Sequence, residues 1–123
     1  MKHKLTFPAI FTILLGLFLL IEGFWGLSSQ VVFGSLPTNT THAVIHIILG
    51  IAGIWMGSTG RPRGFLFFSG FLLLVVGALH FVPDAGELLA DLLNVNRAVA
   101  WVNIATGALS IIIAMASKRG AAS

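Results

Sequence analysis

The sequence predicts an all-α integral membrane protein: a four-helix transmembrane bundle built from two parallel two-helix repeats, with a short outer interfacial helix. Three observations support this prediction. Of the 123 residues, 57% are hydrophobic and only 9% are charged, against about 25% charged residues in an ordinary soluble domain. Four apolar stretches have the length of a membrane span. Six of the seven lysines and arginines fall on one side of those stretches.

The predicted spans form one membrane domain over residues 1–123. They cover residues 7–27, 41–58, 64–82 and 97–116. A spanning helix needs about 20 mostly apolar residues, and each stretch is close to that length. Asn39 is a suitable N-cap for the second span, as Asn94 or Asn96 is for the fourth. Gly60 and Pro62 break the chain between the second span and the third.

The loop between the third and fourth spans has a helical pattern of its own. Glu87 and Asp91 lie one turn apart, and four leucines recur at helical spacing on another face: Leu88, Leu89, Leu92 and Leu93. Such a segment is typical of a short amphipathic helix at a membrane surface. We therefore expect a helix here, lying in the outer interface.

The basic residues orient the predicted bundle. Arg97 lies on one side, and six residues share the other side: Lys2, Lys4, Arg61, Arg63, Lys118 and Arg119. Cytoplasmic loops of membrane proteins carry an excess of lysine and arginine. We therefore expect both termini to be cytoplasmic, and the acidic loop that follows the third span to lie outside.

An internal repeat relates the two halves, residues 7–58 and 64–116. A shift of 57 residues, the spacing from Asn39 to Asn96, also brings His46 onto Asn103 and Gly50 onto Gly107. Each half has two spans, so both halves thread the membrane in the same direction. Small residues let membrane helices approach closely, which predicts a packing role for four glycines: Gly50, Gly53, Gly57 and Gly107.

Polar side chains inside the predicted spans gather near their outer ends. They are Glu22, His42, His46, His80 and Asn103. At 1.5 Å of rise per residue their levels differ by roughly 10 Å or less. An ionisable residue inside a span is costly and is by default a candidate functional position.

Three interpretations of these residues remain open. His42 and His46, one turn apart, bind a metal ion with Glu22 or His80, because imidazole and carboxylate suit zinc, copper, nickel or iron. Alternatively, His46 or His80 is an axial ligand of haem or a related tetrapyrrole. In the third, Glu22, His46, His80 and Asn103 form a hydrogen-bonded cluster that only joins the helices.

No catalytic residue is predicted. The chain has no cysteine, which excludes thiolate chemistry and cysteine-ligated clusters. The sequence contains neither an E-x-x-H nor an H-E-x-x-H motif. The net charge of +3 follows from the topology of the spans, and no nucleic-acid partner is expected.

The stretch PTNTTHAVIHIILGIAGI (37–54) resembles the domain-of-unknown-function 4383 family of small four-span bacterial membrane proteins. The shared motif is N-x-x-H-x-x-x-H-x-x-x-G, here Asn39, His42, His46 and Gly50. Two further matches are the G-x-x-x-x-x-P edge of the third span, Gly77 to Pro83, and the weaker Asn96 to Gly107 copy. The fourth span departs from the family tendency towards a further histidine, since Asn103 stands there. The resemblance implies the architecture and a bacterial inner (cytoplasmic) membrane location, and it brings no activity.

The expected function is that of a small non-enzymatic accessory or scaffold protein of the lipid bilayer, forming a homo-oligomer or joining a larger membrane complex. Four short glycine-rich spans leave little room for a transport pathway within one copy. Two alternatives stay open. One is a metal- or haem-binding membrane protein that uses the His/Glu cluster. The other is an oligomeric channel or proton-coupled carrier with Glu22 facing a shared pore.

Overall fold

The structure is a computed structural model that describes residues 5–117. Four of the basic residues that set the predicted orientation lie outside this range: Lys2, Lys4, Lys118 and Arg119. In chain order the elements are α1 (Phe7–Ser28), β1 (Val31–Val32), β2 (Leu36–Pro37), α2 (Thr40–Ser58), α3 (Pro62–Leu79), α4 (Ala85–Leu93) and α5 (Arg97–Ala116).

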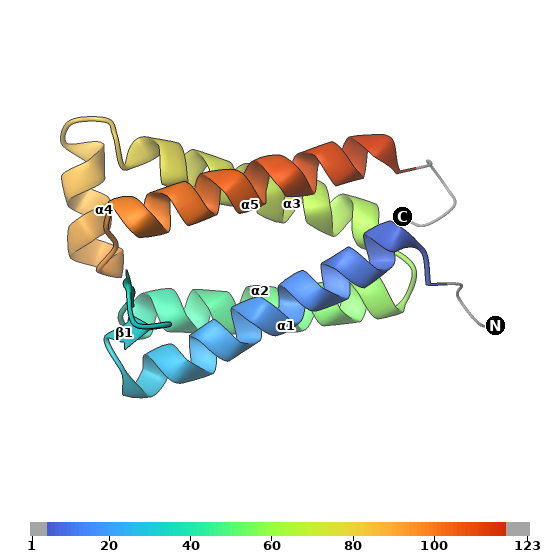
Figure 1. Cartoon of the computed structure of the whole chain (residues 1–123), viewed down its shortest axis with the longest axis horizontal. Coiled ribbons are helices and arrows are strands. Elements are labelled where there is room, and N and C mark those ends of the chain that lie inside the picture. The colour runs from blue at the N-terminus through green and yellow to red at the C-terminus, as the bar shows by residue number, and fades with distance from the viewer. Residues whose placement is uncertain (1–4, 118–123) are drawn as a thin grey trace.

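The prediction of four long apolar helices is confirmed. Helices α1, α2, α3 and α5 are each long and apolar enough to cross a membrane, and they run side by side along the long axis in Figure 1. The short helix predicted after the third span is α4, which stands across one end of the bundle. We call this the α4 end. The opposite end, where α2 turns into α3, is the turn end.

The third span is shifted relative to its predicted bounds. Helix α3 begins at Pro62, where a proline costs no intrahelical hydrogen bond, and it ends at Leu79 instead of residue 82. The backbone N–H groups of His80 and Phe81 reach carbonyls only three residues back. Asp84 then takes a left-handed conformation, with φ of 69°. The apolar residues that follow Leu79 therefore lie in a tight turn, and α4 begins after it at Ala85.

Helices α1 and α2 pack along their length as one hairpin, and α3 and α5 pack as a second. Glycines make both crossings close. A Cβ atom added at Gly50 would lie 2.7 Å from the Gly16 carbonyl oxygen, and one added at Gly107 would lie 2.6 Å from that of Gly70. Only residues without a side chain allow two backbones to approach so closely.

Further glycines extend these contacts. A Cβ at Gly23 would lie 2.8 Å from the carbonyl oxygen of Ala43, and one at Gly77 would lie 2.7 Å from that of Ala100. A Cβ at Gly57 would lie 3.0 Å from the carbonyl oxygen of Ala9. A Cβ at Gly53 would meet both the Phe65 ring and the Gly16 backbone. Within each hairpin, glycines on one helix therefore pack directly against the backbone of the other helix.

The hairpins meet each other through different groups at the two ends. Apolar residues of all four long helices form a core between them: Leu15, Leu19, Leu49, Phe65, Leu66, Ile113 and Ala114. At the α4 end the contacts are polar instead. Asn39 Nδ2 donates to the Leu92 carbonyl at 2.8 Å, and Asn94 Nδ2 donates to the Thr38 carbonyl at 2.6 Å.

A two-stranded antiparallel ribbon between α1 and α2 has no counterpart among the predicted elements. Val31 pairs with Pro37 and Val32 pairs with Leu36. Phe33 lies in the turn with φ of 52°, and its ring packs 4.9 Å from Trp25 and 5.5 Å from Phe18. The ribbon folds back over the α4 end of the first hairpin (Figure 1).

The asparagine caps lead to a first prediction. Asn39 Oδ1 accepts from His42 N at 2.9 Å, and Asn96 Oδ1 accepts from Val99 N at 3.0 Å. We expect Asn96→Ala to cost about 1 kcal/mol, which is a usual value for a lost cap. Asn39→Ala should cost about 1 kcal/mol more, because it also loses the bond to Leu92. Unfolding by sodium dodecyl sulfate, followed by circular dichroism, compares the two; equal losses would show that the bond to Leu92 contributes nothing.

Candidate functional site

The candidate site lies between the two hairpins at the α4 end. Its three ionisable side chains are almost fully buried: Glu22, His42 and His46 have 8%, 6% and 7% of their surface exposed. Glu22 comes from the last two turns of α1, and both histidines come from the first two turns of α2. The close crossing of α1 and α2 brings them together, because Gly23, the neighbour of Glu22, packs against the backbone of Ala43 and Ile47.

Glu22 and His46 form the central contact. His46 Nδ1 lies 3.2 Å from Glu22 Oε1, with the side chains 9% and 10% exposed. The contact is an ion pair when the imidazole carries both ring protons, and a neutral hydrogen-bonded pair when the proton rests on the carboxyl. In either form the two groups compensate part of the cost of burying each other.

His42 lies directly beside this pair. Its ring centroid is 4.3 Å from that of His46, with the planes at 74°, as expected for residues one helical turn apart. Within residues 5–117 the buried Nδ1 atom of His42 has no hydrogen-bond partner. His42 therefore meets the Glu22–His46 pair through the contact of its ring with that of His46.

Asn103 brings the second hairpin to the site. Its side chain, on α5, is buried with 7% of its surface exposed, and it lines two small cavities together with His42 and His46. One of these cavities also contacts Glu22 and has a volume of about 10 Å³. The other, of about 90 Å³, continues between α2 and α3.

The cavity volumes limit what the site can hold as it stands. A volume of about 10 Å³ is near the minimum that one water molecule requires. Sites for organic ligands and cofactors usually measure about 300–1,000 Å³. Neither cavity approaches that size, so a tetrapyrrole at His46 would require the hairpins to separate.

His80 lies elsewhere. It is the C-cap of α3 and lines a separate cavity of about 380 Å³ with residues of the following turn and α4, including Asp84 and Glu87. Its ring packs against Phe81 at 5.1 Å. Of the five polar residues grouped by the sequence, the structure thus gathers Glu22, His42, His46 and Asn103 and leaves His80 apart.

Metal binding can be judged from the donor groups present. Within residues 5–117, no group of three or more His, Asp or Glu side chains is placed so that it could hold a metal ion. Of the four predicted ligands, Glu22, His42 and His46 line one cavity without meeting the geometry of a metal site, and His80 belongs to another cavity. A ligand role for these residues stays a prediction.

Sequence reasoning missed the segment that covers the site. Val32, Leu36, Pro37 and Thr38 of the ribbon and its exit line the cavity next to Glu22, and Val32 is 2% exposed. The only signal in the sequence is weak, namely two valines followed by Phe33 and Gly34. Strands of two residues are too short to show an alternating pattern.

Comparison with known proteins gives one match. The model of a protein family described as a domain of unknown function (DUF4383) matches residues 9–116, which include α1 from Ala9 onward, the other helices and every residue of the site. A search of curated proteins and a search of solved structures found no match.

Proposed function

The chain belongs to the family of the domain of unknown function DUF4383, and from that premise we propose that it is a non-enzymatic accessory or scaffold protein of the membrane. In this proposal it packs with further copies of itself or with a larger membrane complex. In it the Glu22–His46 pair joins α1 to α2, and Asn103 of the second hairpin lies against the same small cavities. The four spanning helices present their remaining faces to lipid or to partner helices.

The observation that carries this proposal is the pairing of the buried Glu22 with His46 beside cavities too small for an organic ligand. The one buried carboxylate, among the residues described, has a buried imidazole 3.2 Å away. The adjoining cavities measure only about 10 and 90 Å³. Polar contacts between membrane helices are worth about 0.6 kcal/mol each on average, so the pair adds to the α1–α2 crossing without a ligand.

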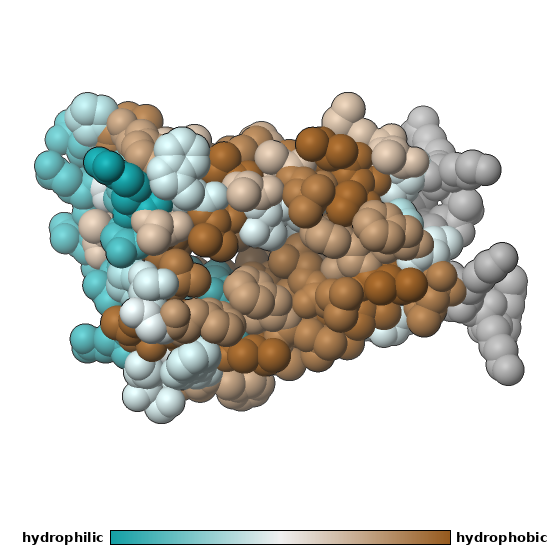
Figure 2. Space-filling model, viewed as in Figure 1, coloured by the Kyte–Doolittle hydropathy of each residue, from teal (hydrophilic) through white to brown (hydrophobic). Residues whose placement is uncertain are grey.

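The outer surface agrees with a role in packing. Large apolar side chains are widely exposed along all four long helices, for example Ile48, Trp55, Phe68 and Ile112 at 62%, 69%, 64% and 61%. Figure 2 shows the apolar band along the bundle and the hydrophilic residues gathered at the α4 end. Such a surface suits lipid, and equally the helices of a partner in the same membrane.

The proposal includes an orientation and an origin by duplication. Arg61 and Arg63 lie at the turn end, and Asp84, Glu87 and Asp91 lie at the α4 end. With the turn end in the cytoplasm the arrangement obeys the positive-inside rule, which suits a bacterial inner membrane. The glycine contacts that recur in the two hairpins support descent from two parallel repeats, 7–58 and 64–116.

The mass of the assembly tests this function. The whole chain is extracted from its native membrane in a mild detergent and its mass is measured by light scattering. We expect a mass well above the 13.1 kDa of one chain, from further copies or from companion proteins in fixed ratio. A monodisperse monomer that carries proton or ion flux into liposomes, with the flux lost in Glu22→Gln, would replace the scaffold by a transport function.

A further inference from the structure

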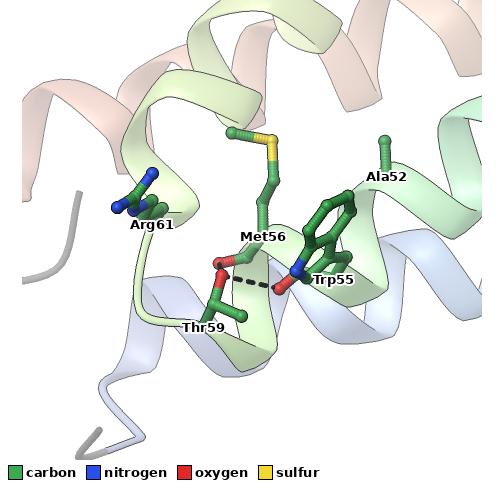
Figure 3. A pocket seen from close by; sticks show the side chains of 5 residues that line it. All are labelled: Ala52, Trp55, Met56, Thr59 and Arg61. Atoms are coloured by element: carbon green, nitrogen blue, oxygen red, sulfur yellow. Dashed lines mark hydrogen bonds between the residues drawn. The ribbon is translucent and has the colours of Figure 1, made fainter.

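A groove at the turn end lies within the exposed apolar surface and adds one cation to it. It measures about 580 Å³ and is lined by Ala52, Trp55, Met56, Thr59 and Arg61. The first four residues have the i, i+3, i+4, i+7 spacing of one helix face, so the groove follows the last two turns of α2. Figure 3 shows the side chains of Ala52, Trp55 and Met56 on the same side of that helix, with Arg61 beyond its end.

The chemistry of the groove changes along its length. Its deeper part is apolar, and the Trp55 ring along it is 69% exposed. The Thr59 hydroxyl donates to the Trp55 carbonyl oxygen at 2.9 Å and so satisfies a carbonyl at the end of α2. The hydroxyl oxygen can still accept a hydrogen bond from a ligand. Arg61 then places an exposed guanidinium at the mouth. An apolar groove along two helical turns, roughly 10 Å, with one cation at its mouth suits the upper part of an acyl chain joined to an anionic headgroup.

Charge at this end favours an anion. All four acidic residues of the chain are Glu22, Asp84, Glu87 and Asp91, and each belongs to the α4 end. The neighbouring Arg63 is already engaged, since its Nε donates to the Ala114 carbonyl at 3.2 Å and its guanidinium lies 4.9 Å above the Phe67 ring. Within residues 5–117 the Arg61 side chain has no hydrogen bond or ion pair with another residue. Its planar fork is suited to bidentate contact with a phosphate.

We propose that this groove is a binding site for an anionic phospholipid. One acyl chain lies along Ala52, Met56 and Trp55, and the phosphate rests on Arg61 where the membrane meets water. Such a site would seat a lipid against the last two turns of α2 and the turn that follows them, on a groove open to the bilayer.

Native mass spectrometry of the full chain in detergent tests the site, with phosphatidylglycerol and phosphatidylcholine as probes at equal concentration. We expect phosphatidylglycerol adducts to exceed phosphatidylcholine adducts on the wild-type chain. Arg61→Gln should weaken phosphatidylglycerol binding about fivefold, since one basic residue near a membrane surface is worth about 1 kcal/mol. The matched control is Arg97→Gln, which removes the same charge from the α4 end and should leave the affinity unchanged.

A second pair of variants tests the acyl channel. Ala52→Phe fills the groove and should weaken phosphatidylglycerol binding, while Ala105→Phe places the same ring on the exposed face of α5 and should not. Equal losses in Arg61→Gln and Arg97→Gln would overturn the proposal, because binding would then follow total charge. Unchanged lipid binding together with a smaller assembly in Ala52→Phe would also overturn it, since the groove would then hold another copy of the chain.

Discussion

Replacing Gly107 by alanine is expected to destabilise the second hairpin by about 3 kcal/mol or more, the upper range of overpacking in a close-packed interior. The added Cβ would lie 2.6 Å from both the Gly70 carbonyl oxygen and the Leu74 amide nitrogen. Both are backbone atoms of a neighbouring helix, so no side-chain rotation relieves the contact. Helices α3 and α5 would have to move apart along their whole crossing. Unfolding of the purified chain by sodium dodecyl sulfate, followed by circular dichroism, measures the loss.

The matched control is Gly64→Ala in the first turn of α3. An added Cβ there would meet nothing within 4 Å, and alanine has the higher helix propensity by about 1 kcal/mol. The control should therefore be neutral or slightly stabilising. Gly50→Ala in the first hairpin should behave as Gly107→Ala does, because its Cβ would meet Gly16 and Leu20 backbone atoms at 2.7 and 2.8 Å. Wild-type stability in both Gly50→Ala and Gly107→Ala would show that the helices do not cross as described.

The second large effect is expected at the buried pair. Glu22→Ala leaves the His46 imidazole buried without its partner, which costs about 1–3 kcal/mol for an unsatisfied polar group. His46→Ala should cost a similar amount. The double variant should cost less than the two single losses together, and the difference should be about 0.6 kcal/mol and no more than about 1.7 kcal/mol, the mean and the maximum for polar contacts between membrane helices. The same detergent-unfolding assay gives all four stabilities of this cycle.

Two controls separate the pair from general effects of charge. Glu87→Ala removes an exposed carboxylate from α4 and should change stability by no more than about 0.5 kcal/mol. Glu22→Gln keeps a hydrogen-bonding side chain of the same shape and should recover most of the loss seen in Glu22→Ala. A coupling energy of zero between Glu22 and His46 would refute a structural role for the pair.

Much of the fold could be predicted from the sequence because lipid imposes simple rules. A span must be long, apolar and helical, and α1, α2 and α5 begin and end within one residue of their predicted bounds. Asn39 and Asn96 were recognisable as caps because a side-chain oxygen before an apolar run is a local signal. The end of α3 was not recognisable, since Phe81 and Val82 are as apolar as the helix and the turn depends on where α4 must cross the bundle.

The candidate site was predictable in part for the same reason. Glu22 and His46 stand out because an ionisable side chain inside a span is rare and needs a partner. Glu22 and His46 face each other because the glycine contacts fix how α1 and α2 are rotated about their axes. The sequence alone does not give that rotation. His80 was grouped with them only because it lies at a similar depth in the membrane. Depth does not determine which face of its helix a residue occupies. His80 ends α3 in a turn and lines another cavity.

We propose that the buried Glu22–His46 pair joins α1 to α2 and holds no cofactor. The most direct measurement combines the absorption spectrum and the elemental content of the whole chain, purified in a mild detergent from its native membrane without chelators or affinity metals. The account predicts a colourless protein without stoichiometric metal, whose His46→Ala variant differs only in unfolding earlier. A Soret band, or one metal ion per chain that disappears in His46→Ala, would contradict it.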